Sequence, residues 1–399
     1  MTTVAIIAEY NPFHSGHEYQ IRKIREEFGE DTAIVAIMSG NFTQRGEIAF
    51  CGKATRAKCA IAGGTNLVLE LPFPYSLASA EFFASAGVFI ANALGNVDYL
   101  SFGSESGDIV QLEECARVLL SDEFRTEFEA LAEEKIGYPE RCEAAYRKIC
   151  PESNVSFSSN NILALEYLKA LIVSESRIKP HTVKRIGADY SEECFIEAPH
   201  QSAMAIRHRF FENAADAFEC VPPFCKNILE DAVADGEIPC LAKKISSAII
   251  TKLRLNPVYP DVEYHDANNG LYNRLRSASF EANDINTLLE LSETKNYTKA
   301  RIRRAMWSIF FGVTSSDMKT PPQYTQILAM DKIGMLLLRT ARKSDDFAIL
   351  TKPSDFEDFS AVQLKQKLLS DSADSVFELT KPVPKSGKSA LKFTPYIKK

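Results

Sequence analysis

The sequence predicts an α/β protein with a parallel sheet in its first half and a mainly α-helical part after it. Three observations lead to this fold class. Short, continuously apolar runs alternate with amphipathic stretches through the first third, turn residues separate them, and the alternation stops near residue 215. Continuous apolar strands separated by helices are typical of a parallel sheet covered on both faces. A chain of 399 residues also exceeds one ordinary domain.

The first domain is expected over residues 1–215 and begins with four buried strands. Gly63 and Gly95 end the second and third helices of this region, and Pro72 ends the third strand. The strands are expected at residues 4–8, 32–38, 67–71 and 99–102, and the helices between them at residues 17–28, 53–62 and 79–94.

A helical insertion is expected at about residues 108–150, which are rich in Glu, Arg and Leu. The chain then returns to the sheet. A helix is expected over residues 162–171, with Asn160 or Asn161 as its cap, because asparagine is a favoured N-cap residue. A fifth strand is expected over residues 182–186.

The second half, residues 216–380, has the pattern of a mainly helical domain. Pro222 and Pro223 break the strand–helix alternation near its start. Helices are expected over residues 240–253, 285–291, 298–311 and 327–340. Residues 381–399 are basic and contain proline, so we expect them to form a flexible tail.

The charge is distributed unevenly along the chain. The net charge is −7, yet residues 291–399 hold 19 Lys and Arg against 11 Asp and Glu. Only this last quarter is suited to a polyanion such as RNA. The alternative is that long charged helices simply vary in sign, and charge alone does not decide between the two.

Composition excludes several classes of protein. No apolar run reaches the roughly 18 residues that a membrane span needs, and the N-terminus lacks the basic and small-residue features of a signal peptide. Nine cysteines are scattered singly without a Cys-x-x-Cys pair. We therefore expect reduced thiols in a cytoplasmic protein, with no membrane partner and no metal site built by the protein.

Residues 11–17 form the segment with the clearest chemistry. They follow the first strand and open the first helix, where ligands bind in open parallel sheets. Gly16 lets the backbone approach a phosphate closely, and His14 and His17 can both face one anionic group. The start of a helix favours a neutral imidazole at His17.

Imidazole N–H groups can donate to phosphate oxygens as charge builds up during nucleotidyl transfer. The alternative is a pair of helix-start histidines whose hydrogen bonds are satisfied by backbone. Two of only six histidines lie within these four residues, beside Pro12 and Gly16, which favours the chemical interpretation. His14 and His17 are therefore the predicted catalytic residues.

The segment His14-Ser15-Gly16-His17 has the His-x-Gly-His signature of the nucleotidylyltransferase superfamily. Residues 9–17, 38–42, 44–47, 69–72 and 102–105 together closely resemble the bacterial tRNA(Met) cytidine acetate ligases. The resemblance covers about residues 1–215 and continues more loosely through residues 298–307 and beyond.

The resemblance implies a Rossmann-like nucleotidyltransferase domain of the HIGH superfamily and a cytoplasmic enzyme. Members of that family convert acetate and ATP to acetyl-adenylate. They then pass the acetyl group to N4 of the wobble cytidine of elongator tRNA(Met). ATP would enter with Mg²⁺, for which the sequence names no ligands, and the oligomeric state is not predicted.

Carried over residue by residue, the resemblance also implies an ATP site. Asn160 is preferred to Asn161, although the sequence does not separate them. The implied residues are Ile7, Ala8, Glu9, Tyr10, Asn11, Pro12, Phe13, His14, Ser15, Gly16, His17, Gln20, Gly103, Asn160, Asn161 and Arg185.

A second phosphate motif is expected at residues 202–207, where Ser202 would cap a helix and Arg207 would add positive charge. Ala203 and Met204 replace small polar residues that such motifs usually carry, which puts phosphate contacts by those side chains in doubt. The alternative is a capped helix with an exposed arginine.

Two further groups are candidates for contact with the acyl substrate or with tRNA. Gln44 and Arg45 follow the second strand, and Lys53 and Arg56 lie on the next helix. For Lys53 and Arg56 the slightly favoured alternative is that they belong to a solvated helix face. The second group lies on a predicted basic helix and could neutralise tRNA phosphates. The alternative interpretation is that these residues are unpaired charges on the surface. The members of the second group are Lys299, Arg301, Arg303 and Arg304.

Two other functions stay open at this point. One is a small-molecule adenylyltransferase or carboxylate-activating ligase of the same superfamily, although such chains are usually shorter and lack the basic helical part. The other is a non-catalytic RNA-binding protein, against which the intact pair of His14 and His17 speaks.

Overall fold

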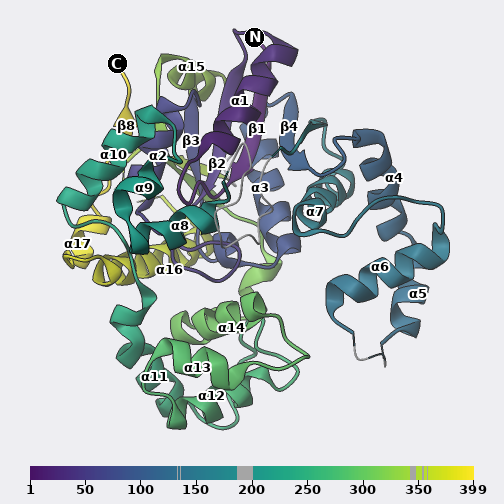
Figure 1. The fold of residues 1–399 in the computed structure, drawn as a ribbon, viewed down its shortest axis with the longest axis vertical. Coiled ribbons are helices and arrows are strands. Elements are labelled where there is room, and N and C mark those ends of the chain that lie inside the picture. Colours follow the sequence, from purple (N-terminus) through teal and green to yellow (C-terminus); the bar gives the residue numbers. More distant parts are fainter. Residues whose placement is uncertain (133, 135, 187–200, 342–346, 353–354, 357) are drawn as a thin grey trace.

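The computed structural model describes residues 1–132, 134, 136–186, 201–341, 347–352, 355–356 and 358–399. Its centre is a mostly parallel sheet with the strand order β5-β4-β1-β2-β3-β6-β7, and β8 also pairs with β6 (Figure 1). The strands are β1 (Thr3–Ala8), β2 (Ala33–Ser39), β3 (Leu67–Leu71), β4 (Tyr99–Ser104), β5 (Lys179–Lys184), β6 (Tyr324–Met330), β7 (Ala348–Leu350) and β8 (Tyr396–Ile397).

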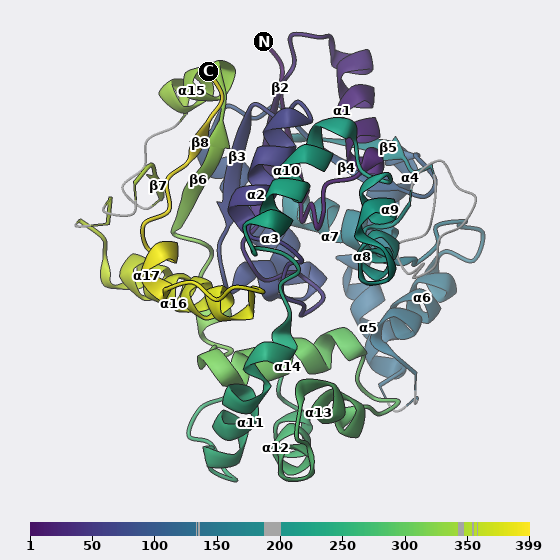
Figure 2. The ribbon, with the colours of Figure 1, turned by 60° about the vertical axis from the view of Figure 1, so that its left-hand side comes forward.

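Helices surround this sheet and form a separate cluster below it in Figures 1 and 2. The helices of the first part are α1 (Ser15–Phe28), α2 (Lys53–Ala62), α3 (Ala80–Leu94), α4 (Ile109–Leu119), α5 (Asp122–Ala130), α6 (Tyr138–Ile149), α7 (Ser159–Val173), α8 (Ala203–Glu212) and α9 (Ala214–Phe218). Those of the second part are α10 (Pro223–Ala234), α11 (Ser246–Leu255), α12 (Leu271–Glu281), α13 (Ile285–Ser292), α14 (Lys299–Phe311), α15 (Lys332–Thr340), α16 (Ala361–Phe377) and α17 (Gly387–Ala390).

The strands β1, β2 and β3 are buried on both faces, which is why the sequence shows continuous apolar runs there. Alternate residues of β1 enter different cores: Ala5 and Ile7 face α3 and α7, whereas Val4 and Ile6 face α1 and α2. The four predicted strands of the first third are confirmed, and the residues of the expected insertion form the helices α4 to α6 beside α7 (Figure 1).

The prediction of one helix over residues 327–340 is wrong, because this run divides into β6 and α15. β6 pairs antiparallel with β3, with Leu67 opposite Met330. Asp331 then caps α15, its Oδ1 accepting a hydrogen bond from the N–H of Gly334 at 2.9 Å. A buried apolar run fits a strand as well as a helix, and pairing with β3 decides the outcome.

The second half of the chain therefore returns to the first domain's sheet and does not stay apart as helices alone. The final residues also differ from the expected flexible tail, because β8 pairs with β6 (Figure 2). Lys381 at the start of this segment is buried and forms an ion pair with Glu378 at 2.8 Å. Basic composition signals a tail only where such partners are missing.

Two local expectations also need correction. The fifth strand, β5, covers residues 179–184 and not 182–186. The N-cap of α7 is Ser158, so Asn160 and Asn161 lie inside the first helical turn and neither is the cap. In the part of the chain that the structure describes, no helix is long and apolar enough to cross a membrane.

Candidate functional site

A cavity of about 380 Å³ opens at the carboxyl ends of β1 and β4. β2 pairs with one side of β1 and β4 with the other, so this is the point where the strand order reverses. Ligands of open parallel sheets bind at such points. Loops and helix starts from α1, α7, α8 and α14 complete the cavity.

His14 and His17 lock each other's orientation at the start of α1. Nδ1 of His14 accepts a hydrogen bond from the backbone N–H of Gly16 at 3.0 Å, and Nδ1 of His17 accepts one from the N–H of His14 at 3.2 Å. The ring centroids are 3.8 Å apart. A neutral imidazole whose Nδ1 accepts carries its proton on Nε2, so each ring contributes an Nε2–H donor.

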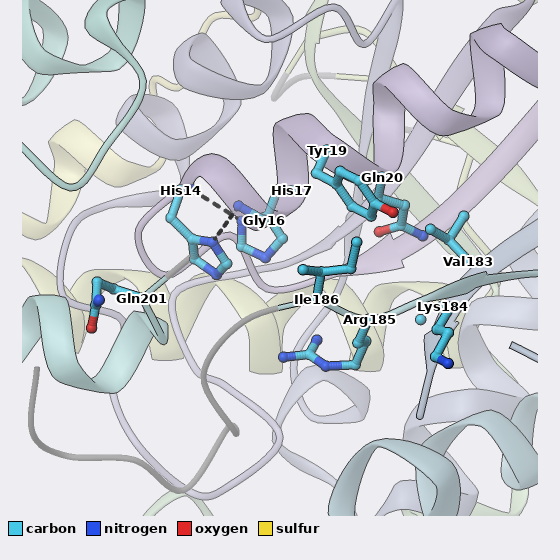
Figure 3. Close-up of a pocket in the computed structure, with 11 residues that line it drawn as sticks. His14, Gly16, His17, Tyr19, Gln20, Val183, Lys184, Arg185, Ile186 and Gln201 are labelled. Carbon is cyan, nitrogen blue, oxygen red and sulfur yellow. Dashed lines mark hydrogen bonds between the residues drawn. The ribbon is translucent and has the colours of Figure 1, made fainter. Parts of the chain in front are cut away.

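The surroundings of His17 favour its neutral form. Burial lowers the pKa of His17 well below its ordinary value, and the nearby His14 and Arg185 lower the pKa further. Arg185 reaches the same pocket from the end of β5, as Figure 3 shows. Burial and the neighbouring positive charge therefore act in the direction that was predicted for His17 at the helix start, toward the neutral imidazole.

Gly103 and Arg185 fit together at the end of β4. A side chain at Gly103 would place its Cβ 3.2 Å from Cγ of Arg185, so glycine lets the arginine lie close to the strand. Both residues line the cavity, together with Asn160 and Gln20. This brings together four of the predicted ATP residues that come from distant parts of the sequence.

Asn160 and Asn161, which the sequence left unresolved, have different surroundings. Asn160 lines the cavity and donates from Nδ2 to Glu105 Oε1 at 2.7 Å. Asn161 is buried: its Oδ1 accepts from the N–H of Glu105 at 3.0 Å, and its Nδ2 donates to the carbonyl oxygen of Ser156. The hydrogen bonds of Asn161 are thus made inside the protein, whereas Asn160 is the one that faces the cavity.

The start of α8 also faces the cavity. Ser202 is its N-cap as predicted, with Oγ accepting from the N–H of Ala205 at 3.0 Å, and Ser202 and Ala203 both line the cavity. Arg207 points elsewhere: it donates to the carbonyl oxygen of Asn11 at 2.9 Å and to Glu47 at 3.0 Å. Its guanidinium therefore holds the loop before His14 in place through the hydrogen bond to Asn11.

The predicted segment before α1 divides between the cavity and the core. Pro12 and Phe13 are buried beneath the site, and Ser15 lies in a separate groove on α1. Gly16 lines the wing of the site beside β5. The cavity itself is lined by Ile7, Ala8, Glu9, Tyr10, Asn11, His14, His17 and Gln20.

The loop after β2 joins the site to the helical cluster. Glu47 accepts from Arg207 at 3.0 Å and from Arg303 of α14 at 2.8 Å. Gln44 and Arg45 line the cavity, as does Thr298, the N-cap of α14. The site therefore includes residues from both halves of the chain.

Lys53 and Arg56 are buried, so the solvated helix face considered for them is wrong. Lys53 Nζ lies 2.8 Å from Glu70 and 2.5 Å from Asp374 of α16. Arg56 is fully buried and donates to the carbonyl oxygens of Glu9, at 2.7 Å, and of Ser39, Gly40 and Cys51. Both cations hold loops around the site in place.

The basic helix α14 does not present one continuous cationic face. Arg304 is buried and donates to Asp266 at 2.6 Å, and Arg303 is engaged by Glu47. Arg301 donates to the carbonyl oxygen of Asp266 at 3.2 Å. Lys299 remains exposed, beside Glu293 at 3.2 Å.

Several cavity residues were not anticipated from the sequence. Phe83, Phe102 and Tyr167 line it but carry the signal of ordinary core residues. Glu47, which lies outside the cavity lining and joins the β2 loop to Arg207 and Arg303, was noted only as part of a motif. Among the described residues, no group of three or more His, Cys, Asp or Glu side chains is arranged to hold a metal ion.

Comparison with known proteins decides the family. A family model described as HIGH Nucleotidyl Transferase matches residues 1–390. A relative from Acetivibrio thermocellus, named tRNA(Met) cytidine acetate ligase, is 34% identical, and the match covers 100% of this chain and 99% of the relative. This chain belongs to the tRNA(Met) cytidine acetate ligase family. A relative of the same name from Caldicellulosiruptor bescii is 38% identical over 76% of this chain and 75% of its own.

Solved structures of this family share the fold. Thermotoga maritima TmcAL in its apo form superposes with a TM-score of 0.91 at 27% sequence identity, covering 100% of this chain and 99% of that one. TmcAL bound with alpha-thio ATP gives a TM-score of 0.90 at the same identity. The family, ligase class and fold that the sequence motifs implied are therefore confirmed.

Proposed function

We propose that this protein activates acetate with ATP and transfers the acetyl group to N4 of the wobble cytidine of elongator tRNA(Met). The observation that carries the proposal is the pair of Nε2–H donors of His14 and His17 at the point where the strand order reverses. The names of the relatives and the ATP analogue bound by Thermotoga maritima TmcAL support it.

The first step joins acetate to the α-phosphate of ATP. A carboxylate oxygen attacks the α-phosphorus, the bond to pyrophosphate breaks, and negative charge builds on the phosphate oxygens. His14 and His17 would stabilise that charge, and the start of α8 at Ser202 would hold the departing pyrophosphate. No covalent enzyme intermediate is needed, because positioning and charge stabilisation suffice.

The remaining ATP contacts follow from the cavity lining. Gly103, Asn160 and Arg185 would hold the ribose and base end of ATP. We propose that Mg²⁺ arrives with ATP, held by phosphate oxygens and water, as is usual for this ion. That binding mode fits a site where the described residues form no three-ligand cluster.

The tRNA would approach across the loop after β2 and the start of α14. Arg45 lines the cavity there and Lys299 is exposed on α14. These cations would neutralise backbone phosphates and position the RNA without reading its sequence. Since ATP and tRNA are both cytoplasmic, the proposal places the protein in the cytoplasm.

The test is ATP–pyrophosphate exchange with acetate and with other small carboxylates, followed by acyl transfer to bulk tRNA. We expect exchange that depends on acetate, and transfer to tRNA. Exchange with another carboxylate but not with acetate would contradict the choice of acid. Exchange with acetate but no transfer to tRNA would instead indicate a small-molecule ligase.

A further inference from the structure

The cavity continues past the two histidines into a space between α3, β4 and α7. We call this space the aromatic compartment. Its walls are Phe83 of α3, Phe102 of β4, and Ile162, Leu163 and Tyr167 of α7. α3 and α7 pack against each other on one face of the sheet (Figure 1). None of these five residues belongs to the proposed ATP site.

Tyr167 carries a buried hydroxyl group for which the described part of the chain supplies no hydrogen-bond partner. Its side chain is 3% exposed, and among the described residues Oη has no hydrogen-bond partner. Its ring lies 5.7 Å from that of Phe102. A buried hydroxyl without a partner costs about 1–3 kcal/mol, so a group of this kind points to a missing ligand.

Glu9 provides a second polar group on the border of the compartment. It lines the same cavity, and Oε1 accepts from the backbone N–H of Gln44 at 2.9 Å, which fixes the carboxyl group. Burial raises the pKa of Glu9. The charge of Glu9 adds to the effect of burial in raising the pKa of the Tyr167 hydroxyl, so the two groups interact.

The compartment lies on the side of the site where the acyl acceptor must arrive. In the proposed first step, acetate attacks the α-phosphorus opposite the departing pyrophosphate. The pyrophosphate would lie at the start of α8, whose Ile206 packs on the face of the sheet covered by α1 and α2. The aromatic compartment is formed by helices of the opposite face.

Neither ATP nor acetate accounts for this space. A separate wing of the site lies at the end of β5, where Val183, Ile186 and Gln201 line it beside Arg185, and it shares no wall residue with the compartment. That wing can hold the base end of ATP. Acetate has a single methyl group, which is too small to fill a space walled by three aromatic rings.

We propose that the aromatic compartment binds the cytosine base that receives the acetyl group. This inference rests on the proposed function and adds the residues that hold the acceptor. The base would stack against Phe102 and Tyr167, as flipped-out bases do in enzymes that modify them. Tyr167 Oη would donate to a ring acceptor of cytosine, and Glu9 would accept from its N4 amine.

The transfer step then balances with groups already present. The N4 lone pair attacks the carbonyl carbon of acetyl-adenylate, a C–N bond forms, and the C–O bond to AMP breaks with its electron pair leaving on AMP. The proton released from N4 passes to the Glu9 carboxylate. Uracil would present an oxygen acceptor to Glu9 in place of the amine, so the same groups discriminate against it.

The test separates the two half-reactions in the full-length protein with the variant Tyr167→Phe, which keeps the ring and removes only Oη. We expect acetate-dependent exchange to match the wild type, and transfer to tRNA to fall about 3- to 10-fold, the effect of one lost hydrogen bond. The matched control is Tyr146→Phe, which removes a buried hydroxyl bonded to Ser153 Oγ at 2.9 Å outside the cavity. It should alter neither half-reaction.

Free nucleosides supply a second measurement. Cytidine should inhibit transfer in competition with tRNA, uridine should not, and inhibition by cytidine should weaken in Tyr167→Phe. Unchanged transfer in that variant, or a fall in exchange with a raised KM for acetate, would overturn the inference. If the wild type shows no acetate-dependent exchange, the proposed function itself fails, and the two failures remain distinguishable.

Discussion

The backbone N–H of His14 donates to Nδ1 of His17 at 3.2 Å, so one histidine fixes the tautomer of the other. The bond belongs to a capping box, in which the side chain of His14 in turn accepts from backbone. The signature pair therefore has two functions. Its Nδ1 atoms complete the start of α1, and both imidazoles line the cavity with their protons on Nε2.

The variant His17→Asn separates these two functions. The asparagine Oδ1 can replace Nδ1 as acceptor, but no donor replaces Nε2–H. We expect a normal melting temperature and acetate-dependent exchange reduced about 10²- to 10³-fold, as for loss of one donor to a developing charge. In His17→Gln the amide can stand near Nε2, so this variant should retain more exchange than His17→Asn. Equal activity in His17→Asn and wild type would contradict the assigned chemistry.

Asn160 and Asn161 should respond differently to the same substitution. Asn160→Ala removes a cavity amide, and we expect KM for ATP to rise about fivefold with little change in melting temperature. Asn161→Ala removes a buried side chain that makes hydrogen bonds to Glu105 and Ser156. It should lower the free energy of unfolding by about 1–3 kcal/mol. A raised KM in Asn161→Ala without loss of stability would reverse the assignment.

The buried cluster of Lys53, Glu70 and Asp374 should make stability depend on pH. Two carboxyl groups share one ammonium, and burial raises the pKa of Glu70 to about 7 from its ordinary value of 4.5. A carboxyl group whose pKa is raised by folding contributes stability that is complete below pH 4.5 and is lost as the pH rises through about 7.

We therefore expect the melting temperature to fall between about pH 4.5 and 7, because the unfolded state ionises Glu70 over that range while the folded state keeps it protonated. In Glu70→Gln, which stays neutral, this dependence should flatten. Differential scanning fluorimetry across the range provides the measurement. A wild-type melting temperature that rises over the same interval would contradict the raised pKa of Glu70.

The histidine pair was predictable because its chemistry lies within one short segment after a buried strand. The surroundings of Lys53 could not be predicted, because its partner Asp374 lies 321 positions further along the chain. Tyr167 and Phe83 were missed for another reason. Buried aromatic residues on helices look the same in sequence whether they fill a core or line a cavity.

The same limit applied to the fold. Strands β1 to β4 follow directly from their apolar runs, because each is bounded by turn residues. The run that became β6 is equally apolar, but it pairs with β3, more than half the chain away. Local pattern cannot reveal that pairing, and for this reason the chain's return to the first sheet was not foreseen.

Gly46 provides a test of the junction between the β2 loop and α14. Its φ is +78°, and an added Cβ would lie 2.5 Å from Cβ of Arg303 and 2.8 Å from the backbone nitrogen of Arg304. Trp307 also donates from Nε1 to the carbonyl oxygen of Gly46 at 3.0 Å. The loop and the helix therefore have no room to accept a side chain.

The control is Gly312, which lies at the C-terminal end of α14. Gly312 has φ of +76° with nothing within 4 Å of an added Cβ, so Gly312→Ala carries the backbone strain alone, about 1–2 kcal/mol. Gly46→Ala adds the cost of overpacking and should lose about 1–3 kcal/mol more in free energy of unfolding. Since Glu47 beside it holds both Arg207 and Arg303, transfer to tRNA should also decline in Gly46→Ala but not in Gly312→Ala. Equal stability of the two variants in urea denaturation would show that the loop does not depend on its packing against α14.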